Sequence, residues 1–352
     1  MRIAFVSWRD LAHPQAGGSE LLVDRLARGC LERGHEAALM CGGPTAPRPY
    51  RVVRIGGTYS QYLRAAVAHL GRFRDWDLVV DVENGIPFFA PLWRRGPVLC
   101  LVHHVHTDQW RQRFPAPVAA ACAALEKYGL PRVYRDRPFM AISPSTAGSL
   151  AGIGVPPERI ATVESGVDPP PGPSEEPDGG PLFVALGRLV PHKRVDLLFR
   201  AWAVVRPLVG GRLVVVGDGP ERERLAAEVP AGAELRGRVS EEEKWSLLRR
   251  AFLLVHAAQH EGWGLVVMEA ASVGVPTLAF DVRGVRDAVV DAQTGVLVDS
   301  EDELVERWVE LARNGRLRRR LGAAALERAR QYSWSATVDR FIELAERTVA
   351  VA

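Results

Sequence analysis

Strand and helix patterns alternate from the start of the chain, in residues 1–40, MRIAFVSWRDLAHPQAGGSELLVDRLARGCLERGHEAALM. The apolar run over 2–7 predicts a buried strand, and a loop containing two glycines follows it. Residues 19–33 form a helical pattern that ends at Gly34, and residues 36–40 predict the next strand. A strand, a helix and a second strand in this order are typical of a parallel sheet covered by helices.

The same alternation continues and then restarts after a break. The break is residues 168–180, DPPPGPSEEPDGG, where proline and glycine are too dense for a helix or a central strand. We therefore predict an α/β protein with two Rossmann-like domains, 1–167 and 181–334, joined by a linker over 168–180. A ligand site is expected in the cleft between them, because clefts between domains are preferred sites. The strands expected beyond the first two are 78–82, 98–102, 139–142, 182–186, 213–216, 253–256, 277–280 and 296–298, and the helices of the second half are 195–205, 241–250, 266–273 and 301–313.

Composition excludes several classes of protein. The chain has 352 residues, of which 47% are hydrophobic and 25% charged, as expected for a globular protein of about two domains. No apolar run reaches the length of about 18 residues that a membrane span needs, and the N-terminus turns polar too early for a signal peptide. The net charge of +3, without a nucleic-acid-binding motif, argues against a nucleic-acid partner. A cytoplasmic protein is expected, with reduced thiols at Cys30, Cys41, Cys100 and Cys122.

Three glycine-containing segments follow predicted strands. Gly17 and Gly18 allow a close approach of the backbone to a ligand, and Ser19 is placed to cap the next helix. Arg188 and Lys193, in GRLVPHKR (187–194), lie at the end of a predicted parallel strand, where they are expected to bind one anionic group together. The segment GDGP (217–220) predicts a tight strand-to-helix turn. It is weak evidence for an NAD-dependent oxidoreductase, because the third glycine of the dinucleotide motif is missing.

A fourth segment, EGWGLVVMEA (261–270), places two acids around the start of a helix. Glu261 is expected in the loop and Glu269 after about one helical turn. The free amides of Gly264, Leu265 and Val266 form an anion site at the helix N-terminus. The segment therefore predicts a phosphate at these amides, with a carboxylate on either side for sugar hydroxyls.

In combination, these segments resemble the retaining glycosyltransferases of family four, which have the two-domain GT-B fold. Glu261 and Glu269 resemble the E-x7-E motif of that family, and Gly187 and Arg188 with Lys193 resemble its phosphate-binding segment. The segments at 17–18 and 217–220 are also similar, although Asp287 stands where the family usually has glutamate. The resemblance covers nearly the whole chain and implies that a C-terminal helix, 335–352, packs back on the first domain.

The resemblance implies transfer of a hexose-type sugar from a UDP- or GDP-linked donor with retention, without a metal or cofactor. The acceptor, a lipid, a polysaccharide or a secondary metabolite, stays open. The implied catalytic residues are His103, Arg188, Lys193 and Glu261, with His104 as the alternative to His103. The implied donor-binding residues are Gly17, Gly18, Arg188, Lys193, Arg238, Val239, Glu261, Trp263, Gly264, Leu265, Val266 and Glu269. A catalytically inactive regulator that binds nucleotide sugars is the alternative function.

Two features of the first half have alternative interpretations. The segment VHHVHTD (102–108) has the residue types of a zinc site, but we expect no metal there and interpret His106 as structural or acceptor-facing. The segment 59–74 predicts a helix with Tyr62, Leu63 and Val67 on one face and arginines around them. Packing of this face into the core is favoured, and peripheral contact with the inner face of a membrane is the alternative.

Overall fold

The computed structural model describes residues 1–57, 59–107, 109–169, 172 and 180–351. It contains two compact units, Met1–Ser165 with Trp334–Ala352, and Gly166–Ser333. Most of the predicted linker over 168–180 lies outside the described residues. Each unit is an α/β structure built on one parallel sheet, so the predicted fold class is confirmed.

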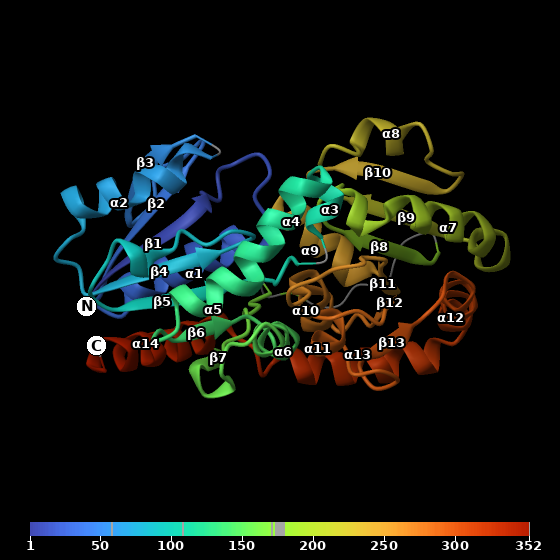
Figure 1. Ribbon diagram of the computed structural model, residues 1–352. Helices are drawn as coiled ribbons and strands as arrows, with labels where there is room; N and C mark the ends of the chain where they lie inside the picture. Colours follow the sequence, from blue (N-terminus) through green and yellow to red (C-terminus); the bar gives the residue numbers. More distant parts are fainter. Residues whose placement is uncertain (58, 108, 170–171, 173–179, 352) are drawn as a thin grey trace. The chain divides into compact units, whose positions relative to one another are not determined.

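The first unit contains a seven-stranded sheet in the order β3-β2-β1-β4-β5-β6-β7 (Figure 1). All neighbouring strands are parallel. The central strands are continuous apolar runs because helices cover both faces of such a sheet. The strands are β1 (Arg2–Arg9), β2 (Glu36–Gly42), β3 (Arg51–Gly56), β4 (Leu78–Glu83), β5 (Val98–Val102), β6 (Phe139–Ala141) and β7 (Ile160–Thr162).

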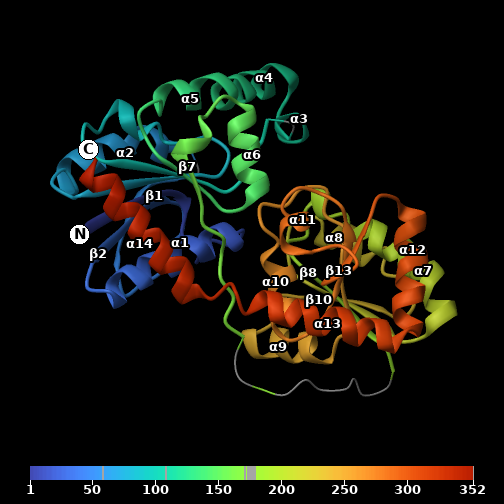
Figure 2. The same cartoon turned by 90° about the horizontal axis from the view of Figure 1, so that it is seen from below.

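The C-terminal helix of the chain belongs to the first unit and lies beside α1 (Figure 2). The Arg33 guanidinium contacts the Asp339 carboxylate at 2.5 Å, and the rings of Phe5 and Phe341 stack with their centroids 5.6 Å apart. The helices of this unit are α1 (Gly18–Glu32), α2 (Ser60–Arg72), α3 (Trp110–Arg113), α4 (Ala116–Ala124), the π-helical segment Leu125–Gly129, α5 (Leu130–Val133), α6 (Pro144–Gly152) and α14 (Trp334–Ala350).

The second unit repeats the architecture with a six-stranded sheet in the order β10-β9-β8-β11-β12-β13. Phe183, Trp202 and Trp308 pack together in its core, with ring centroids 5.5–5.7 Å apart. Its strands are β8 (Leu182–Leu186), β9 (Arg212–Val216), β10 (Ala233–Gly237), β11 (Leu253–His256), β12 (Thr277–Phe280) and β13 (Gly295–Val298). Its helices are α7 (Val195–Val209), α8 (Arg222–Ala226), α9 (Glu241–Arg250), α10 (Leu265–Ser272), α11 (Val285–Ala288), α12 (Glu301–Arg313) and α13 (Gly315–Ala329).

Helix α2 is oriented opposite to the favoured prediction. Its buried residues are Gln61, Ala65 and His69, whereas Leu63 is 85% and Val67 71% exposed. The expected burial of Leu63 and Val67 in the core is therefore wrong. Polar partners inside the unit explain this orientation: the Gln61 amide donates to the Trp8 carbonyl, and the His69 ring contacts Arg94.

Other local predictions have mixed outcomes. Ser19 does not cap α1, because the helix begins one residue earlier and Gly17 is the N-cap. The Gly17 amide instead donates to the Glu20 carboxylate at 2.7 Å. All four cysteines are buried thiols, as predicted.

Candidate functional site

Three neighbouring strands of the second unit end beside one another. Strands β9, β8 and β11 are parallel and adjacent, so their carboxyl ends lie at one edge of the sheet. The loops that follow these strands carry the predicted segments that begin at Gly187, Gly217 and Glu261. Ligands of open parallel sheets bind at this edge, so the topology brings the candidate residues to the expected place.

The loops after β8 and β9 are joined through their backbones. The Leu189 amide donates to the Asp218 carbonyl at 2.9 Å, and the Glu221 amide donates to the Leu189 carbonyl at 3.1 Å. A Cβ at Gly217 would lie 1.8 Å from the Gly187 carbonyl oxygen, so only glycine fits there. The segment 217–220 thus forms a tight turn that supports the loop carrying Arg188.

Arg188 and Lys193 line one hollow at the end of β8. Gly187 and His256 line the same hollow. The structure therefore brings together the two basic residues that were predicted to bind one anion.

Lys193 contacts the first acid of the E-x7-E pattern. Its Nζ lies 2.5 Å from Glu261 Oε2, and His256 Nε2 lies 3.4 Å from the same oxygen. Burial alone would raise the pKa of Glu261, but Lys193 and His256 hold that pKa well below its usual range. Burial and the Lys193 charge lower the pKa of His256. Glu261 is therefore a carboxylate at neutral pH, next to a neutral imidazole, and it can accept hydrogen bonds from hydroxyl groups.

Helix α10 begins directly after this loop. Gly264 is its N-cap with φ of 84°, a conformation that favours glycine. The helix lacks a side-chain cap, so the first amides of α10, from Leu265 onward, lie at an uncapped helix N-terminus.

Glu269 lies in α10, where it is 7% exposed, and it pairs with Lys244 of α9 at 2.8 Å. Burial raises the pKa of Glu269, and Lys244 opposes this shift. Lys244 also contacts the exposed Glu241 at 2.8 Å.

Three further predicted residues lie in different surroundings. The Trp263 ring is buried and packs against Tyr332, with ring centroids 5.1 Å apart. Arg238 is 59% exposed and lies 3.8 Å from the Asp218 carboxylate, while the neighbouring Val239 is half-buried. Trp263 is therefore packed inside its loop, and Arg238 is at the surface.

In the first unit, Gly17 and Gly18 form the start of α1. Glu20, which accepts from the Gly17 amide, also forms a buried ion pair with Arg9 at 2.8 Å. Ser19 Oγ accepts from the Asn84 side chain at 3.0 Å. These contacts hold the loop that contains Gly17 and Gly18 in place.

His103 follows β5 and is 5% exposed. Burial lowers its pKa to about 4, so the imidazole is neutral at neutral pH. Its Nε2 has no hydrogen-bond partner among the residues that the structure describes. A neutral imidazole with a partnerless nitrogen is suited to contact a polar ligand atom.

Comparison with known families matches both halves of the chain. Residues 171–328 match the family described as "Glycosyl transferases group 1", and residues 16–170 match "Glycosyltransferase Family 4". The chain belongs to the GT-B glycosyltransferases of family 4. The family predicted from the sequence is thereby confirmed.

Curated relatives of this family 4 protein include a D-inositol 3-phosphate glycosyltransferase of Thermomonospora curvata, 32% identical over 46% of this chain and 42% of the relative. A GDP-mannose-dependent alpha-mannosyltransferase of Mycolicibacterium smegmatis is 33% identical over 47% of this chain and 43% of the relative. The chain thus spans less than half the length of these relatives. A D-inositol 3-phosphate glycosyltransferase of Salinispora tropica is 26% identical over 95% of this chain and 82% of the relative.

Solved structures show the same GT-B fold. The sucrose-phosphate synthase of Thermosynechococcus elongatus has a TM-score of 0.84 at 18% identity, covering 100% of both chains. Anabaena HepE in complex with UDP and glucose has a TM-score of 0.79 at 15% identity, covering 99% of this chain and 100% of that one.

Two residues of the site in this glycosyltransferase were missed by the sequence analysis. His256 was predicted only as the last residue of a strand, and Lys244 only as part of a helix. Each faces an acid of the E-x7-E pattern from another element. The available indication was that His256 ends a parallel strand, where ligand-site residues gather.

Proposed function

We propose that the chain transfers a hexose-type sugar from a nucleotide diphosphate sugar to an acceptor with retention of the anomeric configuration. One observation carries the proposal: Arg188 and Lys193 line one hollow at the carboxyl end of β8, and Lys193 pairs with Glu261. Two cations and a carboxylate near the carboxyl end of one strand suit a ligand that consists of a diphosphate and a sugar.

The reaction breaks the bond between the anomeric carbon and the diphosphate oxygen, and the electron pair goes to that oxygen. Arg188 and Lys193 stabilise the charge that develops there, since stabilisation of developing charge is a major part of catalysis. The amides of Gly17, Gly18, Gly264, Leu265 and Val266 are proposed as further donors to the diphosphate. The acceptor hydroxyl attacks the same face of the sugar, and its proton moves to the departing phosphate oxygen, so no protein nucleophile is required.

The remaining residues are proposed to position the donor. Glu261, held as a carboxylate, accepts from a sugar hydroxyl, and Glu269 accepts from the ribose hydroxyls. His103 contacts the sugar as a neutral imidazole. Arg238 and Val239 border the base. The burial of Trp263 against Tyr332 favours a supporting role for this ring behind the donor loop.

GDP-mannose is the first donor to test, because one relative is named as a GDP-mannose-dependent mannosyltransferase. UDP-glucose is the second, because the HepE structure contains UDP and glucose. A cyclitol phosphate joins lipids, polysaccharides and secondary metabolites as an acceptor class, since other relatives are named D-inositol 3-phosphate glycosyltransferases.

A peripheral membrane contact is proposed through α2 of the first unit. None of the helices in the described part of the chain has the length and hydropathy that a membrane crossing requires. However, Tyr59, Leu63, Val67 and Leu70 are all more than half exposed and recur at helical spacing. Arg64 and Arg72 on the same helix are exposed and suit anionic headgroups.

Calorimetry followed by a transfer assay tests the main proposal. The protein is titrated with GDP, UDP, GDP-mannose and UDP-glucose, and the donor that binds is incubated with candidate acceptors. Binding of a nucleoside diphosphate, with product of retained configuration by NMR, supports the proposal. No binding of any of the four ligands contradicts it, whereas binding without turnover for any acceptor favours the alternative of an inactive regulator.

A further inference from the structure

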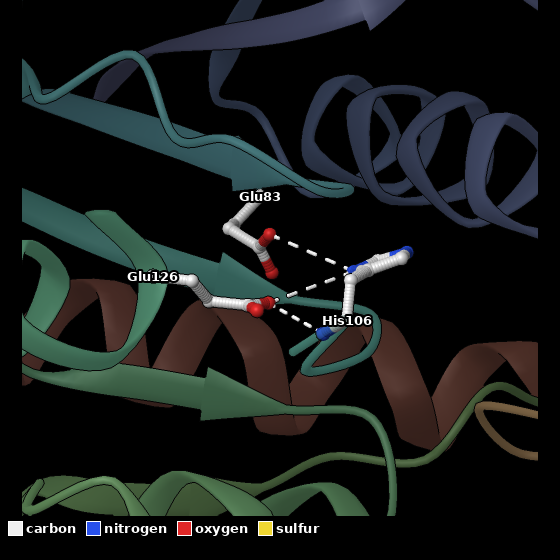
Figure 3. Close-up of side chains that lie close together, drawn as sticks. All are labelled: Glu83, His106 and Glu126. Atoms are coloured by element: carbon white, nitrogen blue, oxygen red, sulfur yellow. Dashed lines mark hydrogen bonds and ion pairs between the residues drawn. The ribbon is translucent and has the colours of Figure 1, made fainter. Parts of the chain in front are cut away.

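A buried cluster in the first unit contains none of the residues that the proposed reaction uses. Glu83 is the last residue of β4, His106 lies in the loop after β5, and Glu126 lies in the π-helical segment between α4 and α5 (Figure 3). The three residues are 1%, 6% and 2% exposed. π-Helical turns occur frequently at functional sites, and this one carries an acid toward two other polar side chains.

Among the residues that the structure describes, neither carboxylate forms an ion pair with an arginine or a lysine. In the described ranges, His106 is the one basic residue paired with either acid, at 4.0 Å from Glu83 and 3.7 Å from Glu126. Another buried acid of this unit differs: Glu20 pairs with the Arg9 guanidinium at 2.8 Å. Two adjacent buried carboxylates repel each other unless a cation or a proton lies between them.

Two polar atoms of the cluster lack a hydrogen bond within the described part of the chain. Among the described residues, Glu83 Oε2 and His106 Nδ1 are both buried without a hydrogen bond. A buried acceptor without a donor costs free energy, so a cation or a proton bound at this point would stabilise the cluster.

We propose that Glu83, His106 and Glu126 bind a divalent transition-metal ion of the Zn²⁺ class. One ligand atom from each residue lies within 4.8 Å of the others. Two bonds of about 2.0–2.2 Å at the tetrahedral angle of zinc hold their ligand atoms about 3.3–3.6 Å apart. The separations of His106 Nδ1 from the carboxylate oxygens, 3.7 and 4.0 Å, would therefore shorten by a few tenths of an ångström around a bound ion. One imidazole and two carboxylates are ligand types that zinc accepts.

The remaining hydrogen bonds hold the ligands in place. Glu126 accepts from the His106 amide at 2.5 Å, from Thr107 Oγ1 at 2.9 Å and from Trp110 Nε1 at 3.1 Å. Glu83 Oε1 accepts from the Gly85 amide at 2.7 Å. Each carboxylate oxygen has two lone pairs. Glu126 Oε2 accepts two of these hydrogen bonds, whereas Glu126 Oε1 and Glu83 Oε1 each accept one and keep a lone pair for an ion.

A bound ion would join three elements that are distant in sequence. It would hold the end of β4, the loop after β5 and the π-helical segment together. The His103 amide donates to the Glu83 carbonyl at 3.1 Å, so the same ion would also fix the segment that carries His103. The site would therefore stabilise the first unit, in contrast to the expectation from the sequence that no metal binds here.

Metal binding by the full-length protein tests the proposal. The chelator-treated protein is titrated with Zn²⁺ against a competing chelator, and bound zinc is counted by mass spectrometry after gel filtration. We expect each chain to retain one zinc ion in the presence of the competing chelator. Glu83→Gln and Glu126→Gln are expected to weaken binding by at least about tenfold, because even partners outside the ligand set contribute about 10–100-fold. His35→Asn, in the same unit but outside the cluster, is expected to bind like the wild type.

A second measurement, on the wild-type protein, tests the proposal even if the variants fail to fold. Zn²⁺ should raise the melting temperature of the stripped wild-type protein, and Co²⁺ should show the visible absorption of a bound ion that His106→Gln abolishes. Equal zinc affinity in the wild type and Glu83→Gln, or no zinc retained by the wild type against the chelator, overturns the proposal. The carboxylates would then be held together by a shared proton.

Discussion

Lys193 Nζ lies 2.5 Å from Glu261 Oε2, although 68 positions separate the two residues in the chain. Glu261 is a carboxylate because Lys193 and His256 overcome the effect of its burial on the pKa. In the proposed function, the pair places a cation for the diphosphate directly beside an acceptor for sugar hydroxyls. A donor bound here would share Lys193 with Glu261, and this sharing couples the diphosphate position to the sugar position.

Lys193→Ala is expected to lower turnover by about 100-fold or more, which corresponds to about 3 kcal/mol of lost transition-state stabilisation. Arg188→Ala should have an effect of similar size, because both residues line the same hollow. Steady-state kinetics with the donor that binds in the calorimetry experiment measures both. Arg200→Ala, which removes an exposed arginine of α7, is the control and should leave turnover unchanged. Near-normal turnover of folded Lys193→Ala and Arg188→Ala would contradict their assignment to the diphosphate.

Glu269→Gln is expected to weaken binding of the nucleoside diphosphate by about tenfold, because a hydrogen bond to a charged group contributes about 1.5–3 kcal/mol. Glu241→Gln is a matched control, since Glu241 contacts the same Lys244 at 2.8 Å but is exposed. Calorimetry should show a loss of affinity for Glu269→Gln alone. Equal losses in the two variants would indicate that the charge of Lys244, and not the ribose contact, determines the affinity.

The first unit is expected to lose stability through its buried histidines as the pH falls from about 6.5 to about 4. Burial and Arg94 lower the pKa of His69 to about 4 from the model-peptide value of 6.5. In this window the unfolded chain binds a proton that the folded chain does not, so acid favours unfolding. Urea unfolding at several pH values should give His69→Gln a smaller pH dependence than the wild type, by up to about 1.4 kcal/mol per pH unit. Identical pH dependence of the two proteins would show that folding does not lower the pKa of His69.

The sequence predicted the sheets better than the helix faces and the side-chain contacts. The strands 98–102, 182–186, 253–256 and 277–280 were predicted with their observed bounds, because buried parallel strands are continuous apolar runs. The edge strands β3, β7 and β10 were missed. Strand β10, AELRG, alternates exposed charges with half-buried residues, so it lacks such a run.

Local sequence patterns do not reveal which residues far apart in the chain are in contact. The apolar spacing of α2 predicted an inward apolar face, but Gln61 and His69 have polar partners inside the unit that the sequence does not reveal. Likewise, only the fold shows that His256 lies beside Glu261 and that Lys244 lies beside Glu269. The glutamates around His106 come from separate elements, and their spacing forms no motif.

The exposed apolar face of α2 predicts binding to anionic vesicles. Leu63→Glu/Val67→Glu should abolish cosedimentation with vesicles that contain phosphatidylglycerol, because it places charges at the two most exposed apolar positions of the helix. Val204→Glu/Leu208→Glu is the matched control, with two exposed apolar residues of α7 in the other unit. Binding of the wild type to the vesicles should weaken at high salt, because salt screens the attraction between the exposed arginines and the anionic headgroups. Wild-type protein that stays in the supernatant with these vesicles would exclude this contact.

Close packing of α14 on α1 predicts opposite effects of one substitution at two helical glycines. A Cβ at Gly29 would lie 2.5 Å from two atoms of Val338, and the helices would have to separate to admit it. Gly29→Ala is therefore expected to destabilise the protein by about 1–3 kcal/mol, as overpacking does. A Cβ at Gly71 in α2 would meet nothing within 4 Å, so Gly71→Ala should raise stability by about 0.4–1 kcal/mol. Urea unfolding of the two variants measures the difference, and a stable Gly29→Ala would mean that α14 does not pack this closely on α1.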